Sequence, residues 1–89
     1  MPTISMFYGI IVRMLFMDNR QHHLPHIHTE YQGMKAVISL PDGNLLEGEM
    51  PPKKLRILQA WIDIHEEELM ANWSLAVRGE PVFPIEPLR

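Results

Sequence analysis

Four of the five histidines of this 89-residue chain lie within seven positions, in the stretch HHLPHIH. Side chains two residues apart on a β-strand share a face, so His26, His28 and Glu30 are expected to point the same way. Imidazole and carboxylate groups in such a row can bind a metal ion or transfer protons. They can also form an ordinary polar strand face that makes hydrogen bonds or contacts a partner. The spacing leaves all three alternatives open.

The two chemical alternatives use overlapping residues. In a metal site, His26 and His28 would ligate Zn²⁺ or another divalent ion, completed by His22, His23 or Glu30. In a metal-free site, one imidazole would act as base and another as acid, as RNA cleavage requires. His26, His28 and Glu30 are therefore the candidate catalytic residues.

Further candidates lie outside this stretch. Trp61 and Trp73 are about 120° apart around a helix, so one can pack on a sheet while the other lies near an edge. An exposed tryptophan marks a contact site, so both are candidate partner-binding residues. His65 falls within an apolar helical stripe and is expected to be a buried structural histidine. Glu47 shares a strand face with Glu49, and strand order would decide whether it approaches the histidine row.

The composition excludes several classes of function. The absence of cysteine excludes disulfides, thiolate catalysis and cysteine-type zinc sites. A formal net charge of −3 argues against stand-alone nucleic-acid binding. No segment approaches the ~20 apolar residues needed to span a bilayer, and the first residues lack the basic region and cleavage site of a signal peptide. We therefore expect a cytoplasmic protein without membrane contact.

Periodicity predicts the elements that position these residues. Apolar, β-branched and aromatic residues run almost without a break over 4–17, which predicts one long strand. Shorter strands are predicted over 26–31, 35–40 and 45–49. From Pro52 onward apolar residues recur every three or four positions, which predicts one helix over 52–78. The tail at 80–89 contains three prolines and is expected to be extended.

Together these elements predict a single small α+β domain over residues 1–89. It would contain a four-stranded antiparallel, meander-like sheet, followed by one long C-terminal helix packed on one face, and an extended Pro-rich tail. The other sheet face would be open to water or a partner. A helix of roughly 26 residues would be about 39 Å long, longer than a short-stranded sheet needs. Its far end should therefore overhang, bend, or pack on a partner or another copy, which leaves a homo-oligomer open.

Five stretches of the chain together resemble a bacterial family catalogued as domain of unknown function 4160: MPTISMFYGI, PHIHTEY, LEGEMPPKKL, ANWSLAVRGE and the closing IEPL. The similarity runs over the entire chain, although Leu24 stands where family members often have the first of two prolines. No activity is established for the family. The resemblance implies a small soluble bacterial protein whose gene often neighbours one for a small helix-turn-helix-like regulator. That arrangement is similar to toxin–antitoxin modules.

Two functions from different classes follow. The first is a protein-interaction component of a two-gene regulatory or toxin–antitoxin-like module, which binds a second small protein such as the neighbouring helix-turn-helix regulator. The alternative is a histidine-dependent RNase or phosphodiester hydrolase, with or without a metal, that uses the His26/His28 pair. The sequence leaves open whether the protein is an enzyme.

Overall fold

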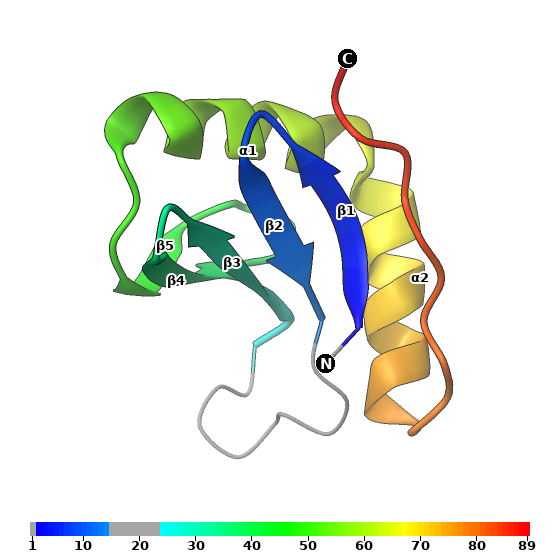
Figure 1. Cartoon of the computed structure of the whole chain (residues 1–89). Helices are drawn as coiled ribbons and strands as arrows, with labels where there is room; N and C mark the ends of the chain where they lie inside the picture. Colours follow the sequence, from blue (N-terminus) through cyan, green and yellow to red (C-terminus); the bar gives the residue numbers. More distant parts are fainter. Residues whose placement is uncertain (1, 15–23) are drawn as a thin grey trace.

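A computed structural model describes residues 2–14 and 24–89 (Figure 1). Five strands form one antiparallel sheet in which chain neighbours are also spatial neighbours. Two helices follow the sheet, and the chain ends in an extended tail. The elements are β1 (Thr3–Phe7), β2 (Ile10–Arg13), β3 (His26–Tyr31), β4 (Met34–Ser39), β5 (Leu45–Gly48), α1 (Pro52–Ile64) and α2 (Glu66–Val77).

The α+β class and the antiparallel sheet are confirmed, but the described residues form five strands and not the predicted four. The segment expected to form one strand from residue 4 is instead the β1–β2 hairpin, which turns at Tyr8 and Gly9. Both turn residues have positive φ, 50° and 81°, as two-residue turns that match the twist of paired strands require. Apolar residues continue through this turn, so hydrophobicity alone does not reveal it. Residues 15–17 of the expected strand lie outside the described residues.

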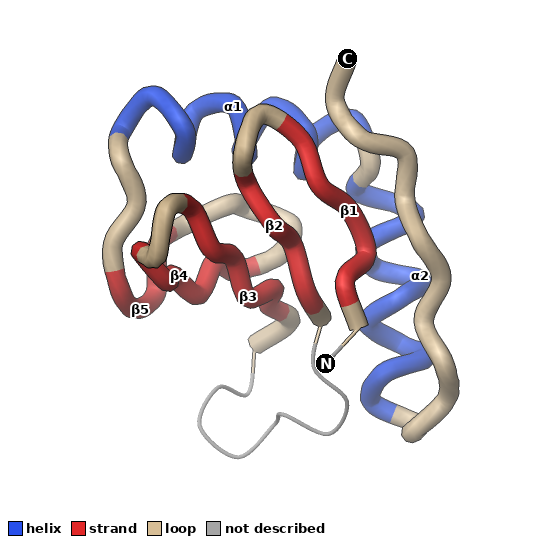
Figure 2. The backbone as a smooth tube through the Cα atoms, in the orientation of Figure 1, coloured by secondary structure: helices blue, strands red, loops and turns tan. Residues whose placement is uncertain are grey.

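The prediction of a single long helix is also wrong, because residues 52–77 form two helices that meet at His65. This residue has φ of −110° and ψ of 26°, and its backbone N–H donates to the Trp61 carbonyl to end α1. The new helix begins at once with three acidic residues, Glu66–Glu68, and carboxylates in a first turn interact favourably with the helix dipole. As a result α1 runs across the strands, whereas α2 lies alongside β1 (Figures 1 and 2).

The core lies between the helices and one face of the sheet. Ile10 and Val12 on β2 and Ile27 on β3 have no exposed area. Trp61 of α1 is equally buried and packs on Phe7, with ring centroids 5.0 Å apart. Burial of each of these side chains stabilises the fold by about 1.5–3 kcal/mol, so this layer holds the helices on one side of the sheet.

The tail lies along the outer edge of β1. The backbone N–H of Ile85 donates to the Ile4 carbonyl at 2.8 Å, and the Ile85 side chain is buried in the core. Asn72, fully buried in α2, pairs with both backbone polar groups of Phe83. Its Nδ2 donates to the Phe83 carbonyl at 2.8 Å, and its Oδ1 accepts from the Phe83 N–H at 3.0 Å. The tail is thus held between β1 and α2 by specific backbone contacts.

Gly48, at the end of β5, occupies a position with no room for a side chain. Its φ is +85°, and a Cβ there would lie 2.1 Å from the carbonyl oxygen of Lys35. Gly33, in the turn between β3 and β4, has a similar φ of +83° but nothing within 4 Å of a Cβ. A substitution at Gly33 therefore introduces backbone strain alone, whereas the same substitution at Gly48 introduces strain and a steric collision.

We expect Gly48→Ala to lower the free energy of unfolding at least twice as much as Gly33→Ala. The Gly33 variant bears only the left-handed backbone penalty of about 1–2 kcal/mol, whereas the Gly48 variant must also displace β5 from β4. Urea denaturation of both variants measures the difference, and equal losses would contradict the close approach at Gly48.

Asn72→Ala is expected to lower the free energy of unfolding by about 2–3 kcal/mol, because it removes two hydrogen bonds and leaves a small cavity. Amide hydrogen exchange should accelerate at Phe83 and Ile85. Ser74→Ala, at an exposed position of the same helix, is the control and should change stability by less than about 0.5 kcal/mol. Unaltered exchange at Phe83 would show that Asn72 does not hold the tail.

Candidate functional site

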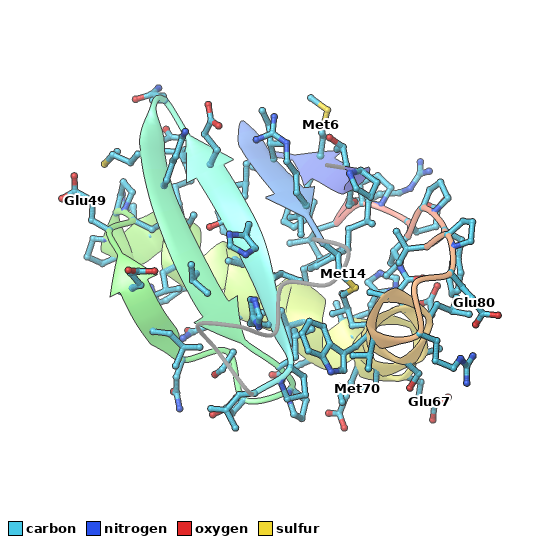
Figure 3. All side chains as sticks on the ribbon, turned by 90° about the horizontal axis from the view of Figure 1, so that it is seen from below. Met6, Met14, Glu49, Glu67, Met70 and Glu80 are labelled. Atoms are coloured by element: carbon cyan, nitrogen blue, oxygen red, sulfur yellow. The ribbon has the colours of Figure 1, made fainter. Side chains whose placement is uncertain are left out.

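The candidate site lies on the sheet face opposite the core, which we call the open face. Along β3, Ile27 and Thr29 are buried on the core side, so the alternation of the strand directs His26, His28 and Glu30 to the open face. Neither α1 nor α2 covers the middle of this face (Figure 3). The period-two pattern of HIHTEY thus separates core side chains from site side chains.

Sheet register brings three other strands to the same place. Arg13 on β2 lies opposite His28, and so does Val37 on β4. Val37 in turn lies opposite Glu47 on β5. Cross-strand partners share a face, so one row of side chains crosses the open face from β2 to β5.

A cleft of about 290 Å³ is hollowed into the open face along this row. Its charged or titratable lining residues come from four strands: Arg13, His28, Glu30, Lys35 and Glu47. Arg13 Nη1 donates to Glu30 Oε1 at 3.2 Å, an ion pair that joins β2 to β3. Two cationic side chains are balanced by two carboxylates, and a half-buried imidazole lies among them. The cleft therefore combines proton-transfer groups with charges of both signs.

His26 does not share this environment. Only 1% of it is exposed, and its ring packs on Trp73 of α2 and edge-on against His28, with centroid separations of 5.0 and 5.2 Å. Its Nδ1 lies 2.7 Å from the Leu24 carbonyl oxygen. A carbonyl only accepts, so Nδ1 carries the hydrogen and donates it. His26 thus joins the start of β3 to α2, and the cleft contains His28 without it.

The metal alternative is partly beyond the described residues. Within residues 2–14 and 24–89, no three histidine, aspartate or glutamate side chains are grouped to hold a metal ion. Of the expected additional ligands, His22 and His23 lie outside those ranges, and Glu30 is paired with Arg13. A Zn²⁺ or other divalent site at His26 and His28 therefore stays a prediction.

The tryptophans and the helical histidine have structural contacts. Trp61 has no exposed area, and its Nε1 donates to the Glu86 carbonyl at 2.8 Å, so it presents no surface to a partner here. Trp73 is half-buried against His26, and its partner-binding role stays a prediction. His65 is half-buried at the helix junction, with Nδ1 2.5 Å from Glu68 Oε1.

The sequence does not indicate Arg13 or Lys35 as site residues, and for Glu47 it leaves the answer to strand order. Each is a single charged residue within a strand, a pattern too common to indicate a site. Strand order decides the matter, because β5 lies next to β4 and only two strands from β3. The alternation of each strand was readable, but the register between strands was not.

Trp73→Leu is expected to shift the imidazole proton resonances of His26, because the ring current of the indole is lost from a centroid distance of 5.0 Å. The resonances of His65 are the internal control, since its ring packs on Trp61 at 5.7 Å instead. Two-dimensional NMR of the imidazoles makes both measurements. A His26 signal unmoved by the substitution would contradict the contact between β3 and α2.

One of three comparisons with known proteins, the comparison with family models, agrees with the sequence resemblance. No curated protein and no solved structure matches the chain. In the part of the chain that the structure describes, no helix has the length and apolar character needed to cross a membrane. The model of a family described as domain of unknown function (DUF4160) matches residues 9–74, from the β1–β2 turn into α2. That range includes every residue of the cleft, and the chain belongs to the DUF4160 family.

Proposed function

We propose that the protein is an interaction component that binds a second small protein through its open face. The supporting observation is the pair Met6 and Ile11, which lie opposite each other on β1 and β2. Met6 is 62% exposed, and Ile11 is partly exposed beside it. Apolar side chains that adjoin a polar cleft, on a face whose middle neither α1 nor α2 covers, resemble the apolar centre and polar rim of protein interfaces.

The charges beside this pair favour a protein as the main partner. Arg13 and Lys35 are matched by Glu30 and Glu47, so the cleft presents both signs within a small area. A protein surface with the opposite arrangement would align with it, and like charges would repel other partners. A long polyanion would gain little from such a face, because its affinity depends on many cationic contacts.

The family resemblance suggests which protein to test. We propose that the partner is the small helix-turn-helix-like regulator encoded nearby, and that the pair forms a regulatory or toxin–antitoxin-like module. In such a module the regulator would cover Met6, Ile11 and the cleft together. One protein would then control access to the other's open face.

The alternative, a histidine-dependent RNase or phosphodiester hydrolase, is supported by the position of His28 in the cleft beside Arg13. His26 is poorly suited to this role, because it is buried and its Nδ1 donates to the Leu24 carbonyl. A catalytic mechanism that uses His28 therefore needs a second proton-transfer group from elsewhere in the cleft.

We expect Met6→Glu to weaken binding to the neighbouring regulator at least tenfold, because it places a charge in the apolar part of the interface. Isothermal titration calorimetry of the full chain measures the affinity. Ile64→Glu is the matched control, since Ile64 is 65% exposed on α1, on the other side of the sheet. No complex at tens of micromolar would exclude this partner, and equal weakening by both variants would exclude the open face.

A further inference from the structure

We infer that the cleft of the open face is an acid–base site for phosphodiester transfer, with Glu47 as base, His28 as acid, and a short ribonucleotide as substrate. The inference deepens the alternative function proposed above, on which it rests, and it does not depend on the interaction function. Of the two histidines expected from the sequence, the site uses His28. Glu47 of β5 takes the proton-transfer role that was expected of the buried His26.

The register places the two proton-transfer groups on opposite sides of one apolar residue. His28 is paired with Val37, and Val37 with Glu47. Adjacent strands are about 4.8 Å apart, so the Cα atoms of His28 and Glu47 are separated by about 10 Å. Val37, although on the open face, is only 7% exposed. The cleft thus has an apolar floor between an imidazole and a carboxylate, and these two groups can flank a phosphate.

A glycine with a left-handed backbone distinguishes Glu47 from Glu49. Gly48 lies between them with a φ of +85°, and the Glu49 N–H then donates to the Lys35 carbonyl at 3.0 Å. Glu47 lines the cleft, whereas Glu49 does not and lies at the outer margin of the sheet (Figure 3). Gly48 also lines the cleft and leaves bare backbone there. Glu49 is therefore a natural control for Glu47.

Two cations line the cleft where a phosphodiester would need them. Arg13 comes from β2 and Lys35 from β4, and positive charge near a reacting phosphate stabilises the charge that develops in the transition state. Glu30 accepts a hydrogen bond from Arg13 at 3.2 Å. This ion pair holds the guanidinium at the cleft, so we assign Glu30 to positioning. The assignment of Glu47 to proton transfer rests on its place opposite Val37, in the same row as His28.

The overall negative charge is not concentrated at the cleft. The acidic run Glu66–Glu68 forms the first turn of α2, and the side chain of Glu67 points away from the open face (Figure 3). Among the described residues that line the cleft, the two cations Arg13 and Lys35 are nevertheless too few to hold a long polyanion. A volume of about 290 Å³ is also near the lower end of small-molecule sites. Both observations favour a substrate with one reacting phosphodiester over a long RNA.

The reaction balances without a metal or a redox partner. The Glu47 carboxylate takes the proton of the ribose 2′-hydroxyl, whose oxygen attacks phosphorus and forms the 2′-O–P bond. The P–O5′ bond breaks, and protonated His28 gives its proton to the leaving 5′-oxygen. The products are a 2′,3′-cyclic phosphate and a 5′-hydroxyl, and proton exchange with water restores both groups. A 2′-hydroxyl is required, so a deoxyribonucleotide is not a substrate.

The test uses the purified full chain with the dinucleoside phosphate UpA, and its 2′-deoxyuridine analogue as the substrate control. We expect uridine 2′,3′-cyclic phosphate and adenosine from UpA, identified by chromatography and phosphorus NMR, and no product from the analogue. His28→Gln and Glu47→Gln should each lower the rate by about 10²-fold or more. Glu49→Gln should leave it unchanged, and equal melting temperatures would show that all three variants are folded.

Several results would overturn the inference. These are no cleavage of UpA by the wild-type chain, cleavage that both variants retain, or cleavage that depends on Glu30 and not on Glu47. Titration of the wild-type chain with uridine 3′-monophosphate provides a measurement that requires no variant. Amide shifts at His28, Val37 and Glu47 are expected, and their absence would remove the site.

Discussion

Burial of one face of the sheet against α1 is the constraint on which the rest of the structure depends. Val12, Ile27 and Ile38 come from three adjacent strands and have no exposed area. Side chains alternate along a strand, so a one-residue slip of β3 would move Ile27 to water and His28 into the core. The positions of the cleft residues on the open face are therefore a consequence of core packing.

The break between α1 and α2 allows α2 to contact β3 and the C-terminal tail. A continuous helix would have projected beyond the sheet, whereas the change of direction at His65 brings α2 alongside β1. From there Trp73 reaches His26 and Asn72 reaches the backbone of Phe83. The same bend thus buries one histidine of the PHIH stretch and secures the C-terminal tail.

The two proposals concern one surface and are compatible. A protein that covers Met6 and Ile11 would also cover His28 and Glu47, because these residues lie on the same face of a five-stranded sheet. Partner binding would then exclude substrate from the cleft. The balanced charges serve both roles, since they match a mixed protein surface and provide two cations for a single phosphate.

Local pattern in the sequence determined the α+β class, the antiparallel sheet and the division of HIHTEY into two faces, because these depend on the backbone periods of strand and helix. Tertiary structure decided what local pattern does not encode. The turn at Tyr8 and Gly9 lies within an unbroken apolar run, and the helix break at His65 within an unbroken apolar stripe. Two features depend on contacts between segments that are distant in the sequence. One is the burial of His26 by α2, and the other is the position of Glu47 in the same cross-strand row as His28. They depend on strand order and helix direction, which are fixed only when the whole core packs.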